Sequence, residues 1–419
     1  MTEEFAVQGL PISALAAEFG TPLYVYDGDV LREVYRSLRD LLDPRIDILY
    51  SAKANPNISV CAVLRSLGAG IEVSSLVELI TAHRAGAEAR DILFLGPGKS
   101  AEELRACVEM GVHAVVCESL DEVEQLNDMA VPGGVDVMLR VNPSFTAKGA
   151  RLSMGGKPRQ FGIDQAVLMR SGSFLRSLKH VRVMGVHGYM GTRILDASNV
   201  VENTRGILAA AEELSAELGF DLETVDVGGG FGVPYFENEK DLDVEALALG
   251  VNAAVADFLG RNSSRVITEL GRYLVGWCGT YVVRARYVKE SMGEWFVVAD
   301  GGTNHHMAAV GIGSFVKRNF PVRSLTRYEE PAHRPYNITG PLCTPNDVVA
   351  KQVALPEVRP GDLLGVERSG AYGPSASPGL FLSHGYPAEV LVLDGTPHLV
   401  RRRDTAEDLL GKQQLIQLG

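Results

Sequence analysis

Lys53 is the first residue of this sequence whose position suggests chemistry. An apolar run, residues 46–52, ends at this lysine, and Pro56 blocks further strand pairing shortly afterwards. A lysine in such a place has two interpretations. It can be an ordinary solvated strand end, or a buried amine that desolvation keeps partly neutral and able to form a Schiff base. The surrounding sequence has to decide between them.

Two glycine-bearing segments further along the chain could bind an anion. After Asp226 the sequence runs Val-Gly-Gly-Gly-Phe-Gly, and the N–H groups of consecutive glycines can turn toward an anion because no side chain intrudes. The second segment begins at Glu269 and brings a carboxylate, one more glycine and a fixed cation. A glycine triplet alone often marks only a tight turn, but a following arginine favours a phosphate site. The predicted anion-binding residues are Gly228, Gly229, Gly230, Gly271 and Arg272.

A lysine amine, a carboxylate and a phosphate cradle are together the parts of a pyridoxal 5′-phosphate site. The amine of Lys53 would bind the cofactor as an imine, the glycines and Arg272 would hold its phosphate, and Glu269 would keep the ring nitrogen protonated. The same three parts could also hold a phosphorylated sugar on a Schiff-base lysine, as in an aldolase. These residues alone leave both hypotheses open.

Another expected strand ends in a segment with two rings. His187 and Tyr189 are two residues apart and share one strand face, so either ring could stack on a flat cofactor. The alternative is that both are core residues. Thr192, close behind, could add a hydroxyl to a phosphate site.

The second half of the chain carries further special residues. Cys343 stands between leucine and threonine in an expected loop, where its thiol could be reactive or simply buried, whereas the other four cysteines lie in apolar surroundings and are expected in the core. Tyr372 lies in a Gly-Ala-Tyr-Gly string. His305 and His306 are residue types that bind metals, but adjacent strand residues point to opposite faces. The sequence therefore predicts no metal site.

The elements that would position these residues follow a repeat that begins near residue 46. Short runs rich in valine and isoleucine alternate with stretches of helical period, giving about eight strand-then-helix units. This rhythm predicts a closed (β/α)8 TIM-like barrel, in which chemistry gathers at the carboxyl ends of the strands and the first and last strands are neighbours. Lys53 and Glu269 should then face one cavity. An open doubly wound sheet is the alternative. The expected strands are residues 46–52, 70–73, 92–95, 114–117, 135–141, 181–186, 224–227 and 266–270.

Outside the repeat, the sequence predicts a second domain and one long loop. After residue 271 helical patterns fade, and short strand runs punctuated by glycine and proline indicate a C-terminal β-sandwich or β-barrel. Residues 1–30 are expected to pack with this β domain. The predicted domains are therefore residues 31–270 for the barrel and 271–419 for the β domain. A basic, glycine-bearing loop at 144–161 interrupts the barrel rhythm.

The composition is that of an ordinary globular protein, with 46% hydrophobic and 22% charged residues among 419. A net charge of −12 argues against nucleic acid or an anionic membrane as a main partner, because both demand a basic face. The first residues lack the pattern of a signal peptide, and no apolar run approaches the roughly 18 residues that span a bilayer. Scattered cysteines without a CxxC pair favour a reducing compartment, so a cytoplasmic protein is expected.

Taken together, these motifs resemble the fold-type III pyridoxal-phosphate decarboxylases, the group of diaminopimelate, ornithine and arginine decarboxylases, across nearly the whole chain. Each motif is modest alone, but their order and spacing are specific. The strings that carry the resemblance are Tyr-Ser-Ala-Lys-Ala-Asn around Lys53, Gly-Val-His ending at His187, Gly-Gly-Gly-Phe-Gly from Gly228, Glu-Leu-Gly-Arg from Glu269, Gly-Pro-Leu-Cys ending at Cys343 and Gly-Ala-Tyr ending at Tyr372.

The resemblance implies roles for the matching residues. Lys53 would bind pyridoxal phosphate covalently, and Glu269 would contact its ring nitrogen. The glycine triplet, Arg272 and Tyr372 would hold the phosphate. Cys343 would return a proton to the substrate carbon after CO2 leaves, and in this family the cysteine comes from the partner subunit. A homodimer with shared active sites is therefore implied.

Departures from the family pattern concern the rings and the substrate. The family usually has histidine at the position of Tyr189, so stacking would fall to Tyr189, with His187 sharing the work. In the basic-amino-acid decarboxylases an acidic residue follows the cysteine and pairs with the distal ammonium of the substrate, whereas this chain has Thr344. Arg193, where the family often has glutamine, could meet a distal anionic or carbonyl group.

A late family motif built around an Asn-Tyr pair is also replaced, here by Gly-Leu-Phe-Leu-Ser-His ending at His384. This pattern resembles a subgroup linked to secondary metabolism, one member of which decarboxylates glutamate attached to an acyl carrier protein. The resemblance thus implies α-decarboxylation of a modified or carrier-bound amino acid, with Arg193, Thr344 and His384 at the substrate. Diaminopimelate decarboxylation is the first alternative. An amino-acid racemase fits the motifs less well, and the presence of both Lys53 and Cys343 opposes a non-catalytic regulatory relative.

Overall fold

The computed structural model describes residues 4–129, 133–145, 152–153, 158–310 and 319–417. These residues form two compact units. The barrel unit comprises Arg32–Pro234 and Glu239–Leu274, and the sheet unit comprises the chain up to Leu31, Tyr235–Asn238 and Val275–Gly419. The short segment Tyr235–Asn238 follows the glycine triplet closely in sequence but belongs to the sheet unit, where the ring of Tyr235 stacks on that of Phe320 at 4.2 Å.

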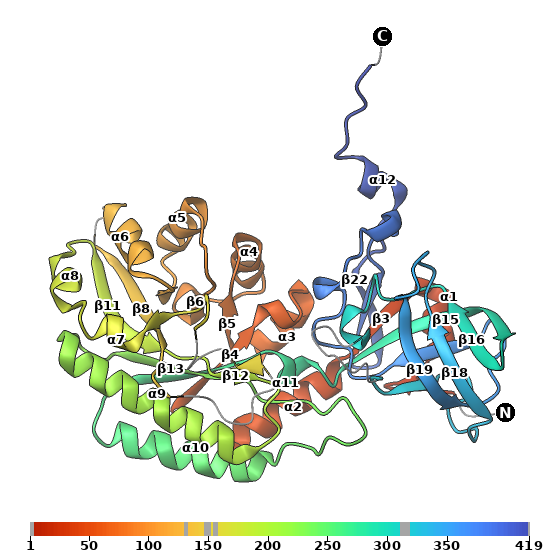
Figure 1. Cartoon of the computed structure of the whole chain (residues 1–419), viewed down its shortest axis with the longest axis horizontal. Helices are drawn as coiled ribbons and strands as arrows, with labels where there is room; N and C mark the ends of the chain where they lie inside the picture. The colour runs from red at the N-terminus through yellow and green to blue at the C-terminus, as the bar shows by residue number, and fades with distance from the viewer. Residues whose placement is uncertain (1–3, 130–132, 146–151, 154–157, 311–318, 418–419) are drawn as a thin grey trace. The chain divides into compact units, whose positions relative to one another are not determined.

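Eight parallel strands form the closed barrel that the sequence predicts (Figure 1). They follow one another around the barrel in chain order. The first strand pairs with the last, with Leu49 opposite Glu269, and this pairing closes the barrel. Closure is what brings residues separated by more than 200 positions to one end of one cavity. The strands are β4 (Ile46–Ser51), β5 (Gly70–Val73), β6 (Ile92–Phe94), β7 (Ala114–Cys117), β8 (Val135–Asn142), β11 (Val181–His187), β13 (Thr224–Gly229) and β14 (Arg265–Leu270).

Helices connect the strands and cover the outside of the barrel (Figure 1). Several begin at a residue whose side chain accepts a free N–H of the first turn, such as Ser75, Ser100 and Asp243. Ser100 and Glu103 form a capping box, and Gly111 ends the same helix in the left-handed conformation. The helices are α2 (Gly28–Leu41), α3 (Ile58–Ser66), α4 (Leu76–Arg84), α5 (Ala101–Met110), α6 (Leu120–Asp128), α7 (Gln165–Leu168), α8 (Gly172–Ser177), α9 (Ala197–Leu218), α10 (Val244–Leu259) and α11 (Arg272–Val275).

Apolar side chains from six of the strands pack together inside the barrel. Burying one such side chain contributes about 2 kcal/mol, so this cluster fixes the strands whose carboxyl ends carry the polar residues described below. Its members are Leu49, Leu93, Leu95, Ala114, Val116, Met138, Met184 and Ile267.

The sheet unit is built on a nine-stranded sheet in which a strand from the beginning of the chain lies in the middle. This strand, β3 (Leu23–Asp27), pairs antiparallel with β15 (Gly279–Ser291) and parallel with β21 (Ala388–Leu393). Its first four residues are all buried, and Leu23 and Val25 pack in the core to which α1 (Ile12–Phe19) also contributes. The other elements are β1 (Ala6–Val7), β2 (Leu10–Pro11), β16 (Glu294–Ala299), β17 (Val322–Ser324), β18 (Arg334–Thr339), β19 (Val348–Leu355), β20 (Leu363–Val366), β22 (Thr396–Arg401) and α12 (Ala406–Leu410).

The loop predicted at 144–161 falls largely outside the residues that the structure describes. Of its backbone, Leu152–Ser153 (β9) pairs antiparallel with β12 (Gly191–Thr192), and Ile163–Asp164 (β10) follows it to pair with β8. Over the described ranges, every helix is either too short or too polar to cross a lipid bilayer.

Candidate functional site

Lys53 lies on a short helical turn, Ala52–Ala54, directly after β4. Its Nζ donates to both carboxylate oxygens of Glu72, at 2.8 and 3.1 Å. The Lys53 side chain is 41% exposed, whereas that of Glu72 is fully buried. The interpretation of Lys53 as a buried amine that desolvation keeps neutral is therefore wrong for this structure, because a carboxylate at this distance favours the ammonium form.

Glu72 is the first residue of the site that the sequence did not reveal. It comes from β5, the neighbouring strand, where the sheet register sets it opposite Ser51. Its Oε1 also accepts the hydroxyl hydrogen of Ser74 at 2.9 Å, so the carboxylate is held from both sides. The ion pair therefore has one fixed, buried partner and one partner that reaches the surface.

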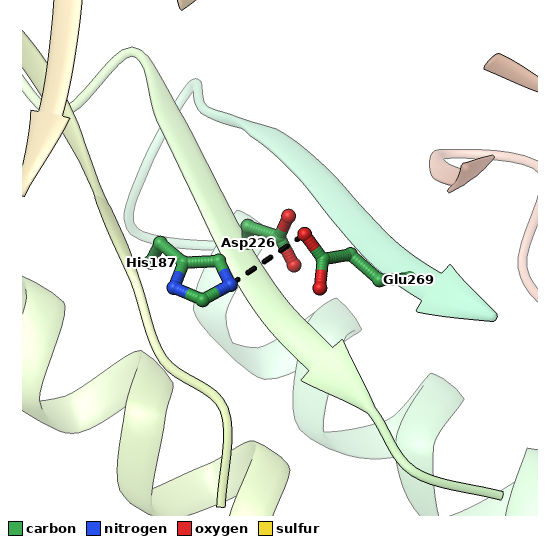
Figure 2. Close-up of side chains that lie close together, drawn as sticks. All are labelled: His187, Asp226 and Glu269. Carbon is green, nitrogen blue, oxygen red and sulfur yellow. Dashed lines mark ion pairs between the residues drawn. The ribbon is translucent and has the colours of Figure 1, made fainter. Parts of the chain in front are cut away.

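Three polar side chains from three strands lie together in the barrel interior (Figure 2). His187 ends β11, Asp226 lies within β13, and Glu269 lies within β14. Nitrogen and oxygen atoms of the three side chains lie within 4.8 Å of one another, and none of the three residues is more than 2% exposed. His187 Nε2 is 3.5 Å from Glu269 Oε1, at the limit of a hydrogen bond. His187 and Glu269 are predicted site residues from the sequence, whereas Asp226 has no role predicted from it.

The two carboxyl groups of this cluster have opposite pKa shifts. Burial and the neighbouring Glu269 raise the pKa of Asp226 well above its ordinary value. Burial would also raise the pKa of Glu269, but His187 and Lys53 outweigh burial and lower it. The negative charge of the cluster therefore resides on Glu269.

The glycine triplet lies where no side chain could be accommodated. A Cβ at Gly229 would be 2.0 Å from the carbonyl oxygen of Glu269, and one at Gly230 would be 2.0 Å from that of Gly191. Gly228 and Gly230 also have φ of +66° and +81°, which side chains disfavour. Close packing of β13 against its neighbours is thus one reason for three glycines.

One N–H group of the triplet departs from the prediction. The amide of Gly228 donates to Asp226 Oδ1 at 2.8 Å, so it does not turn toward an anion. The Gly228 carbonyl accepts the hydroxyl hydrogen of Thr268 at 2.7 Å. Of the three amides, that of Gly228 therefore already has a partner within the protein.

Tyr189 and His187 do not share a strand face, because β11 ends at His187. The ring of Tyr189 lies against the triplet, since a Cβ at Gly228 would meet its Cδ2 at 2.9 Å. Thr192 is half-buried in β12. Arg193 has φ of +60°, and its Nη2 is 3.5 Å from the buried carboxylate of Glu239.

The segment after β14 packs against the turn that carries Lys53. A Cβ at Gly271 would lie 2.9 Å from that of Ala54 and 3.2 Å from that of Ser51. Arg272 follows as the first residue of α11. The barrel unit thus brings together Lys53, Gly271 and Glu269, as the closed barrel predicts.

The remaining predicted residues, Cys343, Thr344, Tyr372 and His384, belong to the sheet unit. All five cysteines are unpaired, and Cys343 is exposed while the other four are buried, as predicted. The exposed thiol follows Leu342, whose N–H donates to the buried carboxylate of Asp347 at 2.8 Å. Asp347 also accepts the N–H of Thr303 at 2.8 Å, which fixes the loop around the thiol.

Strained backbone occurs at Tyr372 and just before His384. Tyr372 has φ of +55°, and Leu382 and Ser383, just before the exposed His384, have φ of +53° and +57°. Non-glycine residues adopt this conformation at a cost of about 1–3 kcal/mol, and such residues cluster at functional sites. Thr344 is half-buried, and its hydroxyl oxygen accepts the N–H of Asn346 at 3.3 Å.

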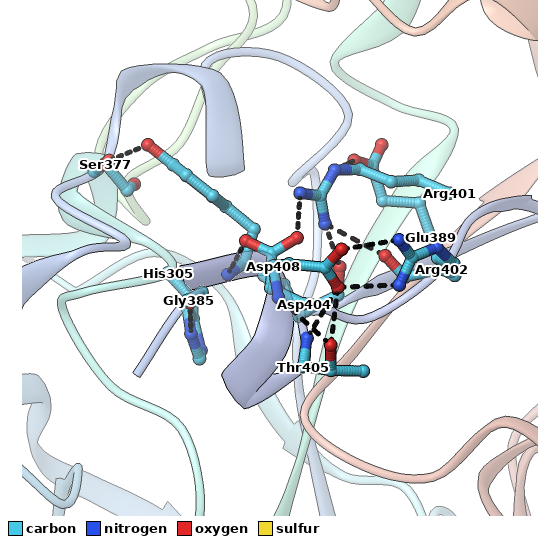
Figure 3. A network of polar contacts seen from close by, with 11 residues as sticks. His305, Ser377, Gly385, Glu389, Arg401, Arg402, Asp404, Thr405 and Asp408 are labelled. Carbon is cyan, nitrogen blue, oxygen red and sulfur yellow. Dashed lines mark hydrogen bonds and ion pairs between the residues drawn. The ribbon is translucent and has the colours of Figure 1, made fainter. Parts of the chain in front are cut away.

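The chain is anchored immediately after His384 (Figure 3). His305 Nε2 bonds to the carbonyl oxygen of Gly385 at 2.8 Å, and Asp404 accepts the N–H of Tyr386 at 2.9 Å. His306, the adjacent histidine, instead bonds to the hydroxyl of Ser369 at 2.7 Å. The two histidines therefore have separate structural partners.

Comparison with known proteins agrees with this arrangement. Residues 28–276 match the family model for the pyridoxal-binding domain of the pyridoxal-dependent decarboxylases. The chain is 38% identical over 409 residues, 96% of each protein, to L-glutamyl-BtrI acyl-carrier protein decarboxylase of Niallia circulans. It is 30% identical over 404 residues to diaminopimelate decarboxylase of Aquifex aeolicus (strain VF5), which covers 96% of this chain and 93% of that protein.

Solved structures of relatives have the same fold. Diaminopimelate decarboxylase from M. jannaschii, in co-complex with L-lysine, superposes with a TM-score of 0.91 at 27% identity, over 99% of this chain and 96% of that chain. The family model covers more than half of this sequence, and the relatives cover nearly all of it. The protein is therefore a member of the pyridoxal-dependent decarboxylases.

Proposed function

We propose that this decarboxylase removes the α-carboxylate of an acidic amino acid that is attached to an acyl carrier protein. The 38% identity to L-glutamyl-BtrI acyl-carrier protein decarboxylase, against 30% to a diaminopimelate decarboxylase, supports a carrier-bound substrate. The observation that carries the proposal is the chemistry of the loop around Cys343. Its neutral character is unsuited to a substrate with a distal ammonium group.

The loop has one carboxylate, and that carboxylate is already committed. Asp347 is buried and accepts hydrogen bonds from the N–H groups of Thr303 and Leu342. Next to the thiol stands Thr344, which is uncharged and hydrogen-bonded to Asn346. A distal ammonium buried beside this loop would lack a carboxylate from it, and an unpaired buried charge costs several kcal/mol.

Pyridoxal 5′-phosphate fits the polar residues of the barrel unit. Glu269 Oε1 and both ring nitrogens of His187 are buried and, among the described residues, have no hydrogen-bond partner. Buried polar atoms in this state are the groups that a bound ligand satisfies. Beside them the glycine triplet offers a backbone surface with no side chains. A lysine, a buried carboxylate and such a surface are the parts that this cofactor requires.

Bound pyridoxal phosphate supplies an electron sink for the electron pair that a departing carboxylate leaves behind. Lys53 would hold the cofactor through its amine. Glu269, kept ionised by His187, would hold a proton on the ring nitrogen, and Tyr189 would lie against the ring. The phosphate would be bound by Gly229, Gly230, Thr192, Gly271, Arg272 and Tyr372, with Gly228 providing space rather than an N–H donor.

Cys343 would donate the proton that replaces the lost carboxylate. Its thiol is exposed and the loop that bears it is fixed by Asp347. We propose that it acts in the active site of a partner subunit, so that the enzyme is a homodimer. Arg193, Thr344 and His384 would contact the substrate beyond its α-carbon. Five unpaired thiols suit a reducing compartment such as the cytoplasm.

A substrate panel tests the proposal. The holoenzyme is incubated with the L-glutamyl thioester of an acyl carrier protein, free L-glutamate, meso-diaminopimelate, L-lysine or L-ornithine, and loss of CO2 is followed by mass spectrometry. The expected result is turnover of the carrier thioester with a kcat/KM at least about 100-fold above that of the free diamino acids. Efficient decarboxylation of diaminopimelate would overturn the carrier-bound substrate and favour the alternative that the solved relatives represent.

The variant Thr344→Glu sharpens the comparison. It puts a carboxylate next to the thiol, where a distal ammonium could pair with it. Because the α-carboxylate must stay free to leave, the thioester occupies the distal carboxyl and is uncharged. An unpaired carboxylate beside it should lower activity toward the glutamyl thioester about tenfold, and its pairing with a distal ammonium should raise activity toward diamino acids about tenfold. Thr344→Gln, of similar size without charge, is the matched control.

A further inference from the structure

Asp226 joins two parts of the barrel site that the sequence motifs describe separately. Its Oδ1 accepts the Gly228 N–H at 2.8 Å, which fixes the carboxyl group at the start of the glycine triplet. Its Oδ2 is buried and has no hydrogen-bond donor among the described residues. The nearest polar groups on that side are the carboxylate of Glu269 and the imidazole of His187 (Figure 2).

The titratable groups around Asp226 come from β11 and β14, which pair with β13, and from β5 and the turn after β4. Lys53, from the turn after β4, pairs with Glu72 of β5 at 2.8 Å. His187 of β11 faces Glu269 of β14 at 3.5 Å. An ionised Asp226 would therefore be a third buried carboxylate beside Glu72 and Glu269, and the nearby Lys53 ammonium already pairs with Glu72. Burying an unpaired charge is far more costly than protonating the carboxylate.

We propose that Asp226 is held as the neutral acid and donates its Oδ2 proton in a hydrogen bond to Glu269. This hydrogen bond gives the buried Asp226 Oδ2, which otherwise has no partner in the described structure, an acceptor, and the remaining lone pairs of the Glu269 carboxylate stay available to a ligand. Asp226 is thus a positioning residue. Through its two oxygens it ties the orientation of the Glu269 carboxylate to the conformation of the glycine triplet. The inference rests on the proposed function only for what Glu269 does to the cofactor.

The variant Asp226→Asn separates this arrangement from an ionised Asp226. An asparagine has the shape of the protonated acid: its Oδ1 can accept the Gly228 N–H and its Nδ2 can donate to Glu269. We expect Asp226→Asn to keep kcat and KM within about threefold of the wild type, whereas Asp226→Ala, which loses both bonds, lowers kcat about 100-fold through misorientation of Glu269. Equal losses in the two variants would overturn the proposal.

Two measurements on the protein without cofactor test protonation directly. The infrared spectrum near neutral pH should show the carbonyl stretch of a buried protonated carboxyl group, and Asp226→Asn should lack that band. Urea denaturation should show that Asp226→Asn is more stable than the wild type. The ratio of the two unfolding equilibrium constants should increase by up to about tenfold per pH unit above pH 4, because folding of the wild type takes up a proton at Asp226. A band that persists in Asp226→Asn, or a ratio independent of pH, would overturn the assignment.

A matched control is Asp136→Asn, which changes an exposed carboxylate of β8 that pairs with Arg182 at 2.7 Å. Asp136→Asn should leave the infrared band unchanged, and its stability relative to the wild type should not depend on pH. The infrared and activity measurements also distinguish a failure of the Asp226 proposal from a failure of the proposed function. If the infrared band behaves as expected but no substrate is decarboxylated, the proposed function fails and the protonation of Asp226 stands.

Discussion

At the scale of single residues, the ion pair of Lys53 with Glu72 bears on how the lysine amine becomes a nucleophile. An ammonium group is not a nucleophile, so the amine must lose a proton before it can attack a carbonyl carbon. The Glu72 carboxylate, 2.8 Å away and hydrogen-bonded to Ser74, is placed to receive that proton. Glu72 is therefore a residue for which catalytic tests are as informative as those on the lysine itself.

Replacement of Lys53 by arginine tests the attachment of the cofactor. Lys53→Arg keeps a cation beside Glu72, so the barrel should remain folded, but a guanidinium offers no primary amine. After incubation with pyridoxal phosphate and reduction with borohydride, the wild-type peptide containing residue 53 should carry a pyridoxyl group, and the peptide of the variant should be unmodified. Peptide mass spectrometry measures both. Labelling of another lysine in the wild type, such as the buried Lys99, would contradict the assignment.

The sequence identifies the chemistry of this site better than its partners. Lys53, Glu269 and the glycines are recognisable because each stands at the end of an expected strand. Glu72 is not, because it lies in a strand of four residues, and its proximity to Lys53 depends on a sheet register that no local pattern encodes. Asp226 was visible only as a residue two positions before a glycine triplet, because the titratable groups around it come from other strands.

At the scale of elements, β13 tolerates little change. Gly229 pairs with Glu269 so closely that a Cβ would lie 2.0 Å from its carbonyl oxygen. We expect Gly229→Ala to lower the free energy of unfolding by about 3 kcal/mol and to displace the Glu269 backbone. Urea denaturation measures the first effect. Gly260→Ala, at the end of α10, where the nearest backbone oxygen is 3.3 Å from the added Cβ, is the control and should change stability by less than about 1 kcal/mol.

The connection after β16 in the sheet unit holds two histidines whose burial has a consequence for acid stability. Burial lowers the pKa of His305 to about 4 and that of His306 to about 3. Below pH 6.5 the unfolded chain therefore binds protons that the folded protein excludes. Stability should be independent of these groups above pH 6.5 and should fall by about 1.4 kcal/mol per pH unit for each histidine as the pH drops toward 4.

The variant His306→Phe checks this origin. It should reduce the slope of unfolding free energy against pH, measured by urea denaturation between pH 6.5 and 4.5, by about 1.4 kcal/mol per pH unit. His398→Gln, at an exposed position of β22, is the control and should leave the slope unchanged. An unaltered slope in His306→Phe would mean that the folded protein already protonates this histidine.

The eight strands of the barrel could be predicted because glycines and polar residues separate apolar runs at regular intervals. The sheet unit was recognisable only as a region of strands. Its strand order was not, because β3 joins β15 and β21 across more than 250 residues, and long-range pairing leaves no mark in local composition. The conformation at Tyr372, Leu382 and Ser383 was also beyond prediction, since left-handed backbone at such residues runs against their preferences.

At the scale of the whole molecule, the proposed homodimer predicts that two inactive variants complement each other. Lys53→Ala chains and Cys343→Ala chains should each be inactive alone. If each site uses Lys53 of one chain and Cys343 of the other, unfolding and refolding the two together restores about a quarter of the wild-type activity, because half of the dimers are mixed and each mixed dimer has one intact site. The measurement is CO2 release before and after mixing.

The control for this experiment is a mixture of two variants of the same residue, Lys53→Ala with Lys53→Arg, which should stay inactive. Recovery in that control would point to contamination rather than complementation. Absence of recovery in the main mixture, with dimers shown to exchange subunits, would place the lysine and the cysteine of each site in one chain.

The central place of β3 in its sheet has a consequence for how the protein is made. A ribosome releases residues 23–27 before the barrel sequence, whereas their partners in β15 and β21 emerge only after it. At typical rates of synthesis the strand waits on the order of tens of seconds, while the complete barrel sequence passes out of the exit tunnel. During that interval an apolar strand with two open edges is exposed to other nascent chains. The barrel can thus begin to fold during translation, whereas the sheet is completed only after β15 and β21 have followed the barrel out of the ribosome.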